Sequence, residues 1–132
     1  MEKQYSFFSL ELDEKTVSLE TELNDVMVSL GMDPEEHRYF AWLRDLVLLA
    51  AVHPDSWQDK YLIKIGLVEN VTYERIRQIL YKTAWDHWSA NSKAVLHNHF
   101  GESLEISFAF GKPNHEEFIL LLSNALRKKY EL

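Results

Sequence analysis

Long side chains that donate hydrogen bonds recur at helical spacing between residues 72 and 88. Arg75, Gln78 and Lys82 stand at positions i, i+3 and i+7, with Tyr81 beside them. At about 100° per residue, these side chains share one side of a helix. Arginine, glutamine and lysine are the residue types that reach base edges and phosphates in a DNA groove. The spacing therefore predicts a helix side suited to nucleic acid; an ordinary solvated helix surface is the alternative.

The other side of the same segment is mostly apolar. It collects Ile76, Ile79, Leu80, Thr83, Ala84 and His87. Thr72 can cap the first free N–H groups, and Glu74 favours the positive end of the helix. A short turn at residues 69–71 separates this helix from a preceding one that begins at residue 55 or 56. Two helices joined by a tight turn, the second with donors facing solvent, predict a helix-turn-helix.

Helical patterns predict most of the remaining structure. The expected helices lie near residues 22–30, with Gly31 as the stop, 34–52, 55–67, 93–98 and 114–129. Asn114 and Glu117 form a capping box at the start of the last one. The chain is therefore predicted to be mainly α, a helix-turn-helix domain of about six helices.

Two segments alternate in the manner of strands. Residues 6–12 and 16–20 flank a polar turn, which suggests a hairpin, although residues 16–28 also fit a helix. Residues 104–110 alternate strictly, with Leu104, Ile106, Phe108 and Phe110 on one side. We therefore expect a small sheet formed by the hairpin and a strand at 104–110.

Composition and charge limit the class of protein. The chain has 132 residues, 46% hydrophobic residues and no cysteine, as expected of one folded domain without disulfides. Its net charge is −7, and residues 1–25 hold seven acids against two lysines. Residues 58–82 hold five cations against three acids. We thus expect an acidic extension at 1–22 and a helical domain at 23–132. With no signal peptide or membrane span in the pattern, a cytoplasmic location is expected.

Other chemistry finds little support in the pattern. His97 and His99 lie two residues apart without an acidic or sulfur ligand nearby, so no metal site is predicted. Asp86, His87 and Ser89 cannot face one another as a triad at their spacing in a helix. No glycine-rich phosphate loop is present. The sequence predicts neither an enzyme nor a cofactor.

Several short motifs occur in the order found in one known family. They are Gly31 with Tyr39 and Leu43-Arg44-Asp45, then Asn70-Val71-Thr72, Trp88-Ser89, and Lys112-Pro113-Asn114 with Glu117-Phe118-Ile119. Together they resemble the C-terminal DNA-binding effector domain of the master sporulation response regulator of endospore-forming bacteria, stage-zero sporulation factor A. The resemblance covers roughly residues 23–132.

The resemblance implies a six-helix, all-α domain that binds promoter DNA, commonly as tandem copies. Arg75 matches an arginine of that family's recognition helix, whereas Arg77, Gln78, Tyr81 and Lys82 replace other residues. The resemblance therefore implies DNA binding, but it does not imply that this chain binds the family's target sequence. The family's receiver domain has no counterpart in the short acidic segment before residue 23, so control by an aspartyl phosphate is not expected.

The sequence thus predicts a transcriptional regulator that inserts helix 72–88 into the major groove of double-stranded DNA, as a homodimer or at tandem sites. Arg75 would bind a guanine and Gln78 an adenine or a neighbouring polar edge. Lys60, Lys64 and Lys82 would contact phosphates, and Arg77 would lie at the groove's flank; Thr72 and Tyr73 are further expected contacts. Tyr81, with Trp85, would pack on DNA sugars and thymine methyls, with burial against another subunit or on the N-terminal hairpin as the alternatives. The alternative is a protein-interaction or anti-regulator module whose degenerate effector fold no longer binds DNA.

Overall fold

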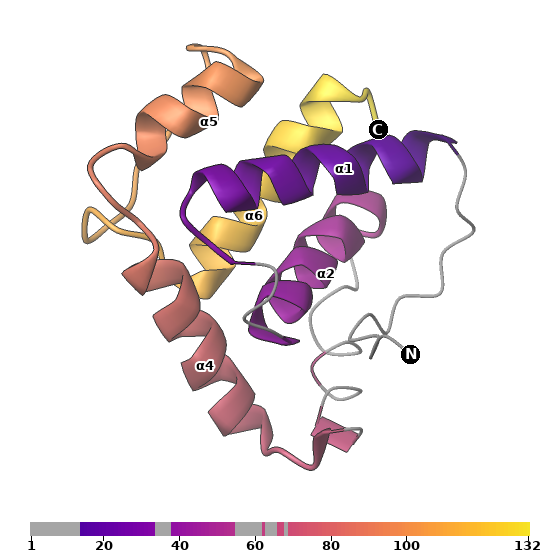
Figure 1. The fold of residues 1–132 in the computed structure, drawn as a ribbon, viewed down its shortest axis with the longest axis vertical. Helices are drawn as coiled ribbons and strands as arrows, with labels where there is room; N and C mark the ends of the chain where they lie inside the picture. The colour runs from indigo at the N-terminus through magenta and orange to yellow at the C-terminus, as the bar shows by residue number, and fades with distance from the viewer. Residues whose placement is uncertain (1–13, 34–37, 55–61, 63–65, 68) are drawn as a thin grey trace.

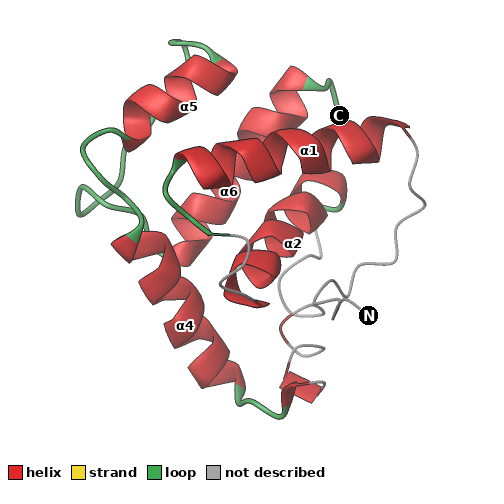
Figure 2. Cartoon of the chain, viewed as in Figure 1, coloured by secondary structure: helices red, strands yellow, loops and turns green. Residues whose placement is uncertain are grey.

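The fold is a bundle of α-helices. The computed structural model describes residues 14–33, 38–54, 62, 66–67 and 69–132. Its helices are α1 (Glu14–Ser29), α2 (Arg38–Val52), α4 (Tyr73–Asp86), α5 (Ser92–Phe100) and α6 (His115–Lys129). Residues 62, 66, 67 and 69 are also helical, and Figure 2 shows no strand within these ranges. The predicted mainly α class is confirmed, with a helix number close to the expected one.

The core forms where α2 crosses α6. This pair makes the most extensive contact between helices, and α1 and α4 pack around it (Figure 1). The completely buried side chains of the two central helices include Trp42, Leu43, Leu46, Val47, Phe118, Ile119, Leu122 and Leu126. Their helical spacing gives each helix one apolar side, and burying both sides against each other supplies the main driving force for the fold.

Helix α1 begins earlier than the sequence suggested. Its apolar residues recur at intervals of three and four, and Leu19, Leu23, Val26 and Met27 are all buried. The predicted second hairpin strand at 16–20 is therefore wrong. The same residues also fit a helical period, and a helix is the conformation that buries their apolar side chains in the core. The first predicted strand, residues 6–12, lies outside the described residues.

Gly31 ends α1 as predicted. It adopts a left-handed φ of 93°, and its N–H donates to the Val28 carbonyl at 2.9 Å. The Met32 N–H donates to the Met27 carbonyl at 3.1 Å. These two bonds form a Schellman motif, which favours glycine because a side chain at positive φ is strained.

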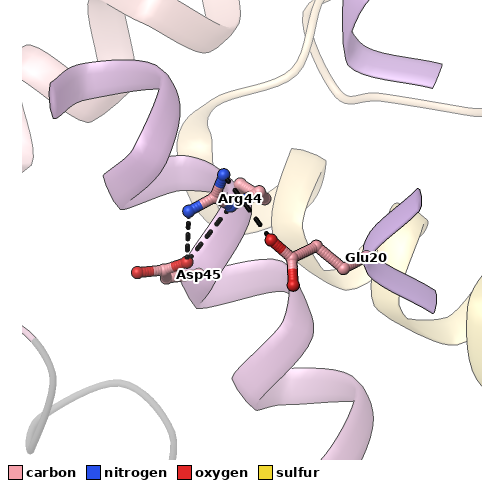
Figure 3. A network of polar contacts seen from close by, with 3 residues as sticks. All are labelled: Glu20, Arg44 and Asp45. Atoms are coloured by element: carbon pink, nitrogen blue, oxygen red, sulfur yellow. Dashed lines mark hydrogen bonds and ion pairs between the residues drawn. The ribbon is translucent and has the colours of Figure 1, made fainter. Parts of the chain in front are cut away.

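Polar contacts attach α1 to its neighbours. The Tyr130 hydroxyl donates to Glu22 Oε1 at 2.7 Å, which raises the pKa of Tyr130 to about 12, and Lys129 forms an ion pair with the same carboxylate. On α2, the Arg44 guanidinium donates to Asp45 at 3.2 Å and lies 3.9 Å from Glu20 of α1 (Figure 3). The segment 14–22 is thus joined to α2 and α6.

The predicted strand at residues 104–110 is wrong. The segment forms no ladder in the structure; it is an extended loop between α5 and α6. Leu104, Ile106 and Phe108 are partly buried against the helical core, while Phe110 is exposed. Residues 104–108 do alternate between partly buried and exposed positions, but in a loop that packs on helices and not in a strand.

Replacing Leu19 with Ala tests the placement of α1. Since Leu19 is 1% exposed, the change should cost about 2–5 kcal/mol of unfolding free energy. Urea denaturation followed by circular dichroism measures it. Val28→Ala is the control, because this α1 side chain is half exposed and should change stability little. Equal, small effects of both changes would contradict the placement of Leu19 in the core.

Candidate nucleic-acid interface

The turn before α4 depends on two residues with special backbone requirements. Asn70 has a left-handed φ of 54°, and the Val71 N–H donates to the Gly66 carbonyl at 3.2 Å. A Cβ at Gly66 would lie 2.9 Å from the Val71 oxygen, closer than atoms pack. The preceding helical residues therefore end in a tight turn. This turn needs glycine at position 66 and a residue that tolerates a left-handed conformation, here asparagine, at position 70. The sequence analysis missed Gly66; its position four residues before Asn70 was the available signal.

Thr72 begins α4 as predicted. Its extended backbone and its side-chain oxygen, which accepts from the Arg75 N–H at 3.2 Å, make it the N-cap. Ile76, Leu80 and Ala84 of α4 are buried, and Ile79, Thr83 and His87 are partly buried beside them. The predicted inward side of this helix is confirmed, and it contacts α6 and α2.

The opposite side of α4 is open to solvent. We define the outer face of α4 as Arg75, Gln78, Tyr81, Lys82 and Trp85; the first four are exposed and Trp85 is partly buried. The helix lies at the edge of the molecule in Figure 1. Lys82 is 79% exposed and pairs with Asp86 at 3.1 Å, one turn further along. Such exposed pairs are weak, so Lys82 can exchange its partner.

Aromatic rings stack along the second half of this face. The Tyr81 and Trp85 rings lie 5.6 Å apart at an angle of 14°. The Lys112 ammonium stands 5.2 Å from the centre of the Trp85 ring, in cation–π contact. The sequence analysis missed Lys112, which is distant in sequence and reaches α4 from the α5–α6 loop.

Arg77 lies at the contact between α4 and α6. Its Nη2 is 3.9 Å from Glu116 Oε1, and its guanidinium carbon is 5.8 Å from the centre of the Tyr73 ring. Next to Glu116, His115 is buried, and among the described residues neither of its ring nitrogens has a hydrogen-bond partner. Arg77 thus links the two helices while its side chain remains 42% exposed.

The predicted contact residues fall into three groups. Arg75, Gln78, Tyr81 and Lys82 are together on the outer face of α4, and Thr72 and Tyr73 are exposed at its N-terminus. Arg77 is turned toward α6. Lys60 and Lys64 lie outside the described residues.

Two further findings concern other kinds of site. The described residues include no group of three or more histidines and carboxylates placed to hold a metal ion. None of the helices within these ranges is both long enough and apolar enough to cross a bilayer.

Comparison of the chain with protein-family models, curated proteins and solved structures gave no match.

The buried histidine makes a prediction about pH. Burial lowers the pKa of His115 below its usual 6.5, with Glu116 opposing and Arg77 adding to this shift. The unfolded chain therefore takes up this proton first as the pH falls, so stability present above pH 6.5 should decline below it. Urea unfolding between pH 7.5 and 5 measures the decline.

Two variants isolate the contribution of His115. His115→Gln should flatten the dependence of stability on pH in this range, whatever its effect on stability at neutral pH. His53→Gln changes an exposed histidine and should leave the dependence as in the unmodified chain. Identical pH profiles for His115→Gln and the unmodified chain would contradict the assignment.

Proposed function

We propose that the protein is a sequence-specific regulator of transcription that binds double-stranded DNA with α4 in the major groove. The main supporting observation is that Arg75 and Gln78 are both exposed, one turn apart, on the first half of a capped helix that follows a tight turn. Recognition helices contact base edges with residues near their N-termini. The ordered motifs shared with the sporulation regulator's effector domain support the same function.

Three polar residues of the outer face and two residues at the start of α4 have distinct roles in this proposal. Arg75 donates two hydrogen bonds to a guanine, and Gln78 contacts an adenine or a neighbouring polar edge. Lys82 leaves Asp86 for a phosphate when DNA arrives. Thr72 and Tyr73, at the exposed start of the helix, lie at the phosphate strand that borders the groove.

Arg77 has a secondary place in the interface. It contacts Tyr73 at the start of α4 and Glu116 of α6, so it lies between the two helices. Its exposed part flanks the groove, so it adds positive charge there without contacting bases. The uneven distribution of charge along the chain reconciles a net charge of −7 with an anionic ligand.

Arg75→Ala tests the proposed recognition. Since the guanidinium binds a base edge, its loss should cost about 1–3 kcal/mol on the preferred duplex and relax base choice at one position. Selection of bound sites from random duplexes, followed by fluorescence anisotropy titration, measures both effects. With about three to five phosphate contacts, log affinity should fall against log salt with a slope of about −3 to −4.5.

The matched control is Lys128→Ala, which removes an exposed cation from the last turn of α6. It should leave base preference unchanged. Unaltered affinity and preference after Arg75→Ala would refute the proposed role of this arginine. Absence of any selected duplex for the unmodified chain would refute DNA binding itself.

A second candidate function is that of a protein-interaction module that binds an intact relative and blocks it. Two observations favour it: Asp86 partly neutralises Lys82, and the stacked Tyr81 and Trp85 rings offer aromatic surface to a partner. In this case the acidic N-terminal segment would screen the outer face of α4 from DNA.

Truncation separates screening from direct binding. Removing residues 1–13 leaves α1 whole, whereas removing residues 1–20 would also delete Leu19 from the core. If the acidic segment screens α4, the truncated chain should bind duplex DNA more tightly than the full chain, most clearly at low salt. Equal affinities of the two chains, titrated side by side, would exclude screening by residues 1–13.

A further inference from the structure

The loop between α5 and α6 is fixed to the C-terminal end of α4 at two points. Phe108 packs edge-on against Trp88, with ring centres 5.0 Å apart. Four residues later, Lys112 lies over the Trp85 ring. Since Trp85 belongs to the outer face of α4, the loop extends that face beyond the helix.

Between these two points the chain reverses in a tight turn. The Gly111 N–H donates to the Phe108 carbonyl at 3.2 Å, and Gly111 has a left-handed φ of 78°. Phe110 lies in the turn and is 83% exposed. The Phe110 side chain is therefore accessible to another molecule beside the outer face of α4.

Lys112 is also available to a ligand. Among the described residues, no carboxylate pairs with it; its ammonium contacts the face of the Trp85 ring. A cation–π contact leaves N–H groups free to donate, and these can bind a phosphate oxygen. Asp86, which follows Trp85 in the sequence, is paired with Lys82.

We propose that Phe110 and Lys112 form a second DNA contact, at the phosphate strand that borders the major groove, and this inference rests on the proposed function of α4. Lys112 binds a phosphate of that strand. Phe110 packs on the sugars just beyond it, at the edge of the adjoining minor groove.

The order of residues along α4 supports this placement of the loop. Trp85 follows Arg75 by ten residues, about 15 Å along the helix axis. A recognition helix contacts bases with residues near its N-terminus. With Arg75 at the bases, the Trp85 end of α4 lies farther from them, and Lys112 above the Trp85 ring is directed to the bordering phosphates.

The test measures affinity and its salt dependence on the duplex selected by the unmodified chain and on an unrelated duplex. Lys112→Gln should weaken binding to both about equally, by roughly fourfold at 0.2 M salt, and reduce the steepness of the salt slope by about 1. Lys112→Arg should restore both. Phe110→Ala should weaken binding several-fold with an unchanged salt slope, because the side chain is apolar.

Matched controls distinguish a local contact from general charge or folding effects. Lys128→Gln removes the same charge from the last turn of α6, and Val28→Ala removes exposed apolar surface from α1. Neither should alter binding. Circular dichroism confirms that each variant has the helix content of the unmodified chain.

The possible outcomes separate the two proposals. If the unmodified chain binds DNA and Arg75→Ala relaxes its base preference, but Lys112→Gln and Phe110→Ala bind like the controls, the second contact is overturned and the function of α4 stands. If the unmodified chain binds no duplex at all, both proposals fail together.

Discussion

The packing of one side of α4 against α6 and α2 determines how the rest of the molecule can act. Ile76, Leu80 and Ala84 are completely buried, so the helix cannot rotate about its axis without exposing them. Because residues three and four apart share a side, that burial leaves Arg75 and Gln78 in solvent. The exposed donors are therefore a consequence of the core. A substitution at one of these inward positions would therefore reorient the exposed donors, whereas a substitution on the surface would remove one of them.

The turn before α4 adds a second constraint, which sets where the helix begins. Gly66 permits the close approach of the Val71 carbonyl, and Asn70 supplies the left-handed conformation that ends the preceding helical residues. Thr72 then caps α4 directly. With the start and the rotation of α4 both fixed, the backbone of the helix holds the outer face in one orientation relative to the core. Arg77 reinforces this arrangement through Glu116 of α6.

Local signals in the sequence predicted most of the helices and the composition of the outer face. Gly31, Thr72 and Asn114 gave correct boundaries because caps act through residues close in the chain. The failures came from non-local packing. The alternation at residues 104–110 could not distinguish a strand from a loop lying on helices. Likewise, nothing near Trp85 in sequence predicts Lys112 above its ring, since only the folded chain brings them together.

The order of the helices has a consequence for how the protein is made. The main partner of α2 is α6, and the Glu22 carboxylate of α1 is bound by Lys129 and Tyr130 after more than 100 intervening residues. A nascent chain emerging from the ribosome therefore cannot close this core until α6 has been translated. Until then the apolar side of α4 has no partner on α6, and the chain remains in reach of chaperones and proteases.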